Sequence, residues 1–196
     1  MKQIYSKTES HKNRRGIAIL WLILWGSVFL TFFCGVLEIA TLWQAQVEVK
    51  NALDAGAMAA VKEWGVSGSG SSTQVSRNVG IAYVEANPIL GTPVTLTSNY
   101  IAATPGNPNG NLLCTGNFVF GALDQITAPI TFDRNAQGGC IAGFPAVVAQ
   151  ATVPVQGFCS SLFGVTFFNI SSQSTAYYNC GTGRASLVSA TVPVCP

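Results

Sequence analysis

The chain has 196 residues, of which 48% are hydrophobic and only 9% are charged, against about 25% charged residues in an ordinary soluble domain. Half of the ten Lys and Arg residues lie before Gly16, and the rest of the chain carries five basic against seven acidic residues. This excludes the basic folded face of a nucleic-acid-binding protein. The single histidine, His11, lies in the basic leader, and the chain has no Gly-rich phosphate-binding loop. We therefore expect no enzyme activity, no cofactor and no metal site.

A single apolar run follows the basic leader of residues 1–16. The sequence GIAILWLILWGSVFLTFFCGVL, residues 16–37, contains no charge, and as a helix it would be about 33 Å long, enough to cross a bilayer core of about 30 Å. The alternative is a buried core helix, but the rest of the chain is too small to surround it. The run is longer than the apolar part of a signal peptide and lacks a small-x-small cleavage site. We expect an uncleaved transmembrane helix over 17–37, with Cys34 as a thiol embedded in the membrane.

Charges on either side of the run predict its orientation. The residues that carry this signal are Lys12, Arg14, Arg15 and Glu38. Basic residues stay on the cytoplasmic side of a membrane. We therefore expect a single-pass protein of a bacterial inner membrane, with a cytoplasmic N-terminus and a periplasmic C-terminal domain.

The helical pattern continues through residues 38–64, without proline. The expected apolar stripe consists of Ile39, Leu42, Val49, Leu53, Ala57, Ala60 and Trp64. The opposite, polar side of the helix consists of Gln44, Glu48, Asn51, Asp54 and Lys62. Lys50 and Asp54 can pair at i, i+4. Small residues recur every four positions at Ala52, Gly56 and Ala60, and at Ala55 and Ala59. They can receive helices of other proteins or pack on the chain's own C-terminal domain, and we favour the second because it is the usual fate of an amphipathic stripe.

A Gly/Ser linker, residues 65–72, separates this helix from an exported α+β domain, residues 73–196. Its first element is a short helix over 73–86, capped by Ser72 or Thr73 and stopped before Pro88. The expected apolar face of this helix is Val75, Val79, Ala82 and Tyr83. Strands of one antiparallel sheet are expected at 93–102, 112–121, 129–134, 146–156, 166–178 and 184–194.

Five cysteines lie beyond the apolar run, and in an oxidising compartment they indicate disulfides. Metal binding is the rival interpretation, but no pair has the Cys-x-x-Cys spacing. Five is an odd number, so several arrangements stay open; among them we favour Cys114–Cys140 and Cys159–Cys180. Cys195 would then be free, either to link two chains or to stay reduced.

Two carboxylates of the strand-rich part, Asp124 and Asp133, are the candidates for an anchored hydrolase. Such isolated aspartates flanked by loop residues are usually solvated turn residues. Catalysis is therefore the weakest of the functional interpretations.

The first third of the chain resembles the N-terminus of TadG-like and TadE-like proteins of the bacterial tight-adherence (Flp-type) pilus systems. The resemblance is carried by Arg-Arg-Gly at 14–16, one apolar span, Glu38 at its outer end and VEVKNALDAGAMAAVKEW at 47–64. The positions that match the family motif are Asn51, Ala52, Asp54, Ala55, Ala57, Ala59 and Ala60. The segments 146–155, 162–165 and 170–176 follow the order of the family's C-terminal region.

The sequence departs from the family pattern at two points. Trp21 stands where members that are cleaved at the glycine corresponding to Gly16 carry a glutamate, which argues against cleavage there. The chain also has no room for the von Willebrand factor A domain of longer members, so it resembles a short form.

The resemblance implies a non-catalytic, membrane-anchored component of pilus assembly, or a minor-pilin-like subunit. Its partners would be the membrane and other pilus-assembly or pilin-like proteins, contacted through the N-terminal helix. The alternative is an anchored extracytoplasmic module for binding or adhesion.

Overall fold

A computed structural model describes residues 14–67, 72–98, 108–110, 114–136, 140, 143–160, 164, 167–189 and 192–194. Its helices are α1 (Arg14–Ser67) and α2 (Gln74–Glu85). Its strands are β1 (Phe118–Leu123), β2 (Phe132–Asp133), β3 (Phe144–Val155), β4 (Phe168–Asn179) and β5 (Arg184–Leu187). The expected α+β class is confirmed: a long apolar N-terminal helix and a short second helix precede an antiparallel, disulfide-containing sheet.

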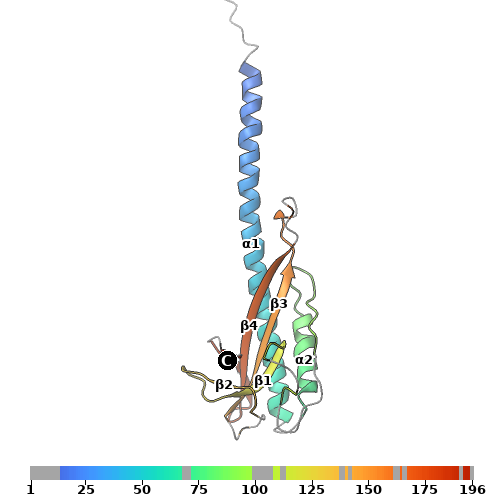
Figure 1. The fold of residues 1–196 in the computed structure, drawn as a ribbon, viewed down its shortest axis with the longest axis vertical. Helices are drawn as coiled ribbons and strands as arrows, with labels where there is room; N and C mark the ends of the chain where they lie inside the picture. Colours follow the sequence, from blue (N-terminus) through green and yellow to red (C-terminus); the bar gives the residue numbers. More distant parts are fainter. Residues whose placement is uncertain are drawn as a thin grey trace, which may run out of the picture.

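Helix α1 is one uninterrupted element of 54 residues. Its N-terminal part projects alone from the rest of the molecule, and its C-terminal part lies against the sheet (Figure 1). The apolar window of this helix, in which no residue is buried, is the one segment of the described chain long and apolar enough to cross a membrane. The helix ends at Ser67 rather than near Trp64, because Gly65 packs directly against the ring of Tyr178 and keeps this turn on the sheet.

The C-terminal part of α1 buries the face that its sequence predicts, with one exception. Five of the seven stripe residues are buried, namely Val49, Leu53, Ala57, Ala60 and Trp64, and Leu42 packs against the same cluster. Ile39 is 70% exposed, so its assignment to the stripe is wrong. Ile39 lies on the same side of α1 as Gly35 and Val36, which are also exposed, so the buried stripe begins only further along the helix.

Helix α2 forms where it was expected, but it buries a different face. Val75 and Tyr83 are exposed, whereas Ser76, Arg77, Gly80 and Val84 are buried. Gly80 lies against α1, where a Cβ atom would be 3.0 Å from the Cβ of Ala60. The close approach of the two helices therefore requires a glycine at position 80, with Val84 buried beside Gly56 of α1, while Val75 and Tyr83 remain outside.

The five strands form one antiparallel sheet in the order β2-β1-β3-β4-β5. The central pair is β3 and β4, which run together from Ala146↔Tyr177 to Val155↔Phe168. Strand β1 covers only the first half of β3, ending at Phe118↔Ala149, so the second half of β3 has a neighbouring strand on one side only. That second half leads to the end of the hairpin that lies beside the apolar part of α1 (Figure 1).

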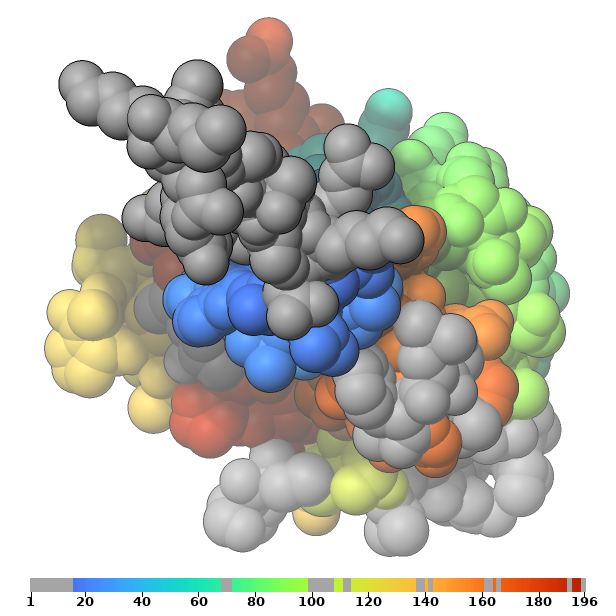
Figure 2. Space-filling view, turned by 90° about the horizontal axis from the view of Figure 1, so that it is seen from above, coloured from blue at the N-terminus to red at the C-terminus, as the bar shows by residue number. Residues whose placement is uncertain are grey.

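Each face of the sheet has its own cover. Side chains of β1, β3 and β4, such as Phe120 and Val147, pack with α1 and α2 in the main core. On the opposite face, Val192 and Val194 pack on the sheet. Seen from the apolar end of α1, β3 and α2 lie on the same side of this helix (Figure 2).

Five of the six predicted strands overlap an observed one, with inexact bounds, whereas the prediction of a strand at 93–102 is wrong over its described residues 93–98. Of residues 184–194, those that the structure describes form a strand only over Arg184–Leu187, because Val192 and Val194 leave the sheet plane to cover its far face. Within 93–102, residues 93–98 are not a strand although Val94 and Leu96 are buried, and 99–102 lie outside the described residues. The linker residues 68–71 also lie outside them.

Candidate functional site

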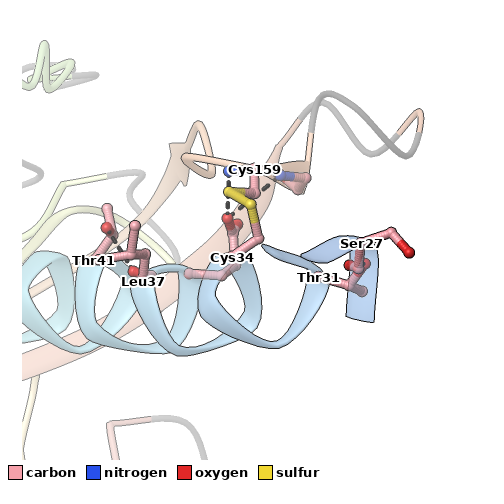
Figure 3. The surroundings of a disulfide bond; sticks show 8 residues. Ser27, Thr31, Cys34, Leu37, Thr41 and Cys159 are labelled. Atoms are coloured by element: carbon pink, nitrogen blue, oxygen red, sulfur yellow. Dashed lines mark hydrogen bonds between the residues drawn. A yellow bond between two sulfur atoms is a disulfide. The ribbon is translucent and has the colours of Figure 1, made fainter. Parts of the chain in front are cut away.

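The junction between the apolar and the packed parts of α1 is the best-defined local site of the molecule. Cys34, inside the apolar run, forms a disulfide with Cys159, which follows β3; their Cα atoms are 5.7 Å apart. Figure 3 shows the bond bridging the helix and the chain at the end of the β3–β4 hairpin. A covalent bond thus fixes the end of the hairpin to the last turns of the apolar segment.

Glu38 adds a polar contact one turn after Cys34. Its Oε2 accepts hydrogen bonds from the backbone N–H of Cys159 at 2.8 Å and of Ser160 at 3.3 Å. Gly157 lies directly against Oε1, where a Cβ atom would collide with the carboxylate. Within the described residues, Oε1 itself is buried without a hydrogen-bond partner. The residue that ends the apolar run is thus enclosed by the hairpin, and it does not project freely into solvent.

The disulfide pairing differs from the expected one. The structure joins Cys34 to Cys159 and Cys140 to Cys180, so the pairs Cys114–Cys140 and Cys159–Cys180 are wrong. Cys114 is also disulfide-bonded, and Cys195 lies outside the described residues. Cys34 is therefore not a free membrane-embedded thiol.

The physical reason is that the β3–β4 hairpin turns back along α1, which places Cys159 beside Cys34 and far from Cys180. Cys180 follows β4 at the opposite end of the sheet, where it reaches Cys140. Spacing along the chain contains none of this information, because Cys159 lies at the turn end of the antiparallel hairpin and Cys180 lies one strand length away at its open end.

The small residues of α1 serve packing within the chain, as favoured above. Ala52, Gly56 and Ala60 are buried. A Cβ atom at Gly56 would be 2.9 Å from the carbonyl oxygen of Gly80 and 3.3 Å from the Phe118 ring. This face is closed by α2 and β1, so it offers no surface to another protein.

The remaining motif residues lie beside this contact. Ala55 and Ala59 are half-buried, Asn51 is exposed, and Asp54 forms the expected ion pair with Lys50. Of the topology residues, Arg14 and Arg15 begin α1 and Lys12 lies outside the described residues. Gly16 is exposed, with no atom of another part of the chain near it.

The apolar part of α1 carries a second row of small residues that the sequence analysis did not single out. Ser27, Thr31 and Gly35 line one side of it. The Ser27 hydroxyl donates to the Leu24 carbonyl oxygen, and the Thr31 hydroxyl donates to that of Ser27, both at 2.9 Å. Both hydroxyls are thus satisfied within the helix, which lets this surface face an apolar environment.

Arg77 is a further residue that the sequence analysis missed. It is 1% exposed, and its guanidinium donates to the carbonyl oxygens of Phe118 and Pro108 and to Oδ1 of Asn109. The guanidinium carbon lies 4.6 Å from the centre of the Phe120 ring. An arginine is ordinarily exposed, so the sequence contains no local signal for this position.

A cavity of about 810 Å³ lies between the open half of β3 and the chain that follows α2. Its walls include Thr95, Thr97 and Thr152, and the aromatic rings of Phe158 and Phe167 lie at the hairpin end. None of the described residues that line it is charged. The cavity can therefore accept uncharged groups, by apolar contact or through hydroxyl hydrogen bonds.

The two candidate catalytic carboxylates stand at strand ends: Asp124 follows β1, and Asp133 is the last residue of β2. Asp124 Oδ1 accepts from the backbone N–H of Thr131 and of Gln125, each at 2.8 Å, and the bond from Thr131 is the main cause that lowers the pKa of this carboxyl. Asp133 Oδ1 accepts from the N–H of Asn135 at 2.9 Å. Each carboxylate holds its own turn, which is the ordinary role of such residues.

Across the described part of the chain, no three His, Cys, Asp or Glu side chains gather where they could hold a metal ion. What the geometry does supply is a protruding apolar helix, a covalent tie at its base and an uncharged cavity beside that tie. Comparison with family models, with curated proteins and with solved structures finds no match to this chain.

Proposed function

We propose that this protein is a non-catalytic, membrane-anchored component of a bacterial tight-adherence pilus system, acting in assembly or as a minor-pilin-like subunit. One observation supports it above the others. A single helix of 54 residues is wholly exposed over its apolar window and forms one layer of the folded domain over the rest. Such a helix couples a rigid domain to neighbouring helices in a membrane or a filament.

The same proposal places the N-terminus in the cytoplasm and the sheet outside the inner membrane. The basic residues before the apolar run favour this orientation. The disulfides Cys34–Cys159 and Cys140–Cys180 favour an oxidising compartment for the domain. Both arguments point to the same side of the membrane.

Partner contact is assigned to the apolar part of α1. Ser27, Thr31 and Gly35 lie four residues apart on one side of the helix, and small residues at this spacing let two helices approach closely in a membrane. The small residues Ala52, Gly56 and Ala60 of the packed part are already buried, and Gly56 lies against α2 and β1. The expected docking face is therefore N-terminal to Glu38.

Deletion of the gene, with complementation, tests this function. The deletion strain should lose its pili and its surface adherence, and the wild-type gene should restore both. Gly35→Leu should fail to restore them although the protein is stably produced, because Leu prevents close helix approach. Val75→Leu, at an exposed position on α2, is the control that should complement. Normal piliation in the deletion strain would refute the proposal.

The N-terminus of the mature protein distinguishes an assembly component that stays in the membrane from a minor-pilin-like subunit that enters the filament. A mass that begins at Met1 supports a permanent anchor in the assembly machinery. A mass that begins at Ile17 means that the chain is processed after Gly16 despite Trp21 and enters the filament. Intact mass spectrometry of the membrane-extracted protein measures this directly.

The cavity favours a second candidate, an anchored module that binds a surface glycan. Its threonine hydroxyls and uncharged walls suit a neutral sugar. Thr95→Trp should fill it and abolish binding of the detergent-solubilised full chain to a glycan array, whereas Val75→Trp on α2 should not. No binding by the wild-type chain would rule this candidate out.

A further inference from the structure

We propose that the end of the β3–β4 hairpin inserts Phe158 and Phe167 into the outer interface of the same bilayer that α1 crosses. The partner of this surface is the phospholipid itself. This inference rests on the membrane anchoring in the proposed function, and it adds a second point of membrane contact that belongs to the sheet.

The disulfide determines the depth of the hairpin end. Cys34 lies three residues before Leu37, the last residue of the apolar run, which places it about 4.5 Å inside that run along the helix axis. The Cα atoms of Cys34 and Cys159 are 5.7 Å apart, and consecutive Cα atoms are about 3.8 Å apart. Phe158 therefore cannot leave the level at which the apolar helix ends.

The side chains at this level suit the lipid interface. Phe158 is 67% exposed and Phe167 is 61% exposed, although both rings line the same cavity. On α1, Ile39 and Trp43 are exposed at the same end of the apolar run. Aromatic side chains collect at the boundary between lipid and water. We therefore expect the rings of Phe158 and Phe167 to lie at that boundary.

The hairpin and the chain segments directly before and after it contain no charged residue. No Asp, Glu, Lys or Arg occurs from Asn135 to Gly183. Glu38, the charged residue that follows the apolar run, turns its carboxylate into the hairpin, where it accepts hydrogen bonds from the N–H groups of Cys159 and Ser160. The surface that approaches the membrane thus presents neither a free carboxylate nor a cation, which favours a neutral lipid boundary over a charged protein partner.

The experiment places the photo-crosslinking residue p-benzoylphenylalanine at Phe158 or at Phe167 of the full chain in phosphatidylcholine proteoliposomes. Phe29, exposed in the middle of the apolar run, is the positive control, and Tyr83, exposed on α2, is the negative control. Each variant replaces one aromatic ring with another. The intact disulfide, checked by mass before irradiation, confirms that the hairpin is in place.

After irradiation, the mass of one phosphatidylcholine should be added at Phe158, Phe167 and Phe29, but not at Tyr83. Lipid adducts at Phe29 alone would overturn the hairpin contact and leave the anchoring intact. Crosslinks from Phe158 and Phe167 to a second copy of the chain would overturn it in favour of a protein contact. No lipid adduct at Phe29 would overturn the anchoring, and the hairpin contact with it.

Discussion

Cys34 and Cys159 are separated by 125 residues in the sequence and are joined by a disulfide that crosses from α1 to the end of the β3–β4 hairpin. The bond links α1 covalently to the end of the hairpin, so the helix and the sheet cannot separate at this point. Glu38 reinforces it with hydrogen bonds to the amides of Cys159 and Ser160. Both contacts lie where the apolar part of α1 ends, so the orientation of the domain relative to that part of the helix is fixed there.

Removal of this disulfide should destabilise the domain. In the chain-entropy description a bridge contributes about 2–4 kcal/mol, and more for a longer loop. Cys34→Ser with Cys159→Ser opens a separation of 125 residues, whereas Cys140→Ser with Cys180→Ser opens one of 40. The first double variant should lose about 1 kcal/mol more than the second, by the logarithm of the loop lengths. Denaturant unfolding in detergent, followed by circular dichroism, compares them.

Gly56 and Gly35 lie on the same helix, one in a packed face and one in an open face, so the same substitution can be compared at both. Gly56→Leu should destabilise the isolated protein by about 1–3 kcal/mol, because its side chain meets Val84, Phe118 and the Gly80 carbonyl group. Gly35→Leu should leave the stability unchanged, since nothing lies near that position within the chain. Thermal unfolding in detergent measures both. Equal stability of the two variants would contradict the assignment of the Gly56 face to internal packing.

Arg77→Met should cost about 2–4 kcal/mol of unfolding free energy. The methionine fills part of the space but leaves the Phe118 carbonyl oxygen without the donor that it has in the wild type. Arg184→Met, at an exposed position on β5, is the control and should change the stability by less than about 0.5 kcal/mol. Chemical denaturation of the two variants, compared with wild type, checks the difference.

The turn between Asp124 and Thr131 should depend on pH. The Thr131 N–H stabilises the ionised carboxylate and lowers the pKa of Asp124 in the folded state. A lowered folded pKa means that the stabilisation is fully present above the carboxyl's unfolded pKa and is lost as the pH falls through the folded value. The Thr131 and Gln125 amide resonances should shift together in that acidic range. Asp124→Asn should abolish this titration, and an unchanged titration in that variant would assign it to another group.

The sequence predicts those features of the fold and the site that depend on residues close together in the chain. The apolar run, the pairing of Lys50 with Asp54 and the small-residue face of α1 depend on neighbours within a few turns of one helix, and the structure contains all three. The face of α2 was mispredicted because its burial depends on how closely α1 approaches. Gly80 fits that contact, and Arg77 is buried by hydrogen bonds to Phe118, Pro108 and Asn109, whereas the apolar Val75 and Tyr83 are exposed.

The sequence by itself determined that this chain has one long apolar helix, a cysteine-containing β-rich domain and only twelve charged residues beyond its basic leader. These properties follow from composition and from periods of two and about four residues, which are local. Only the tertiary structure decided which cysteines meet, that Glu38 is enclosed and that Phe158 and Phe167 lie at the end of the apolar run. The physical reason is that a hairpin of two long strands brings together residues more than a hundred positions apart, according to how the sheet packs on α1.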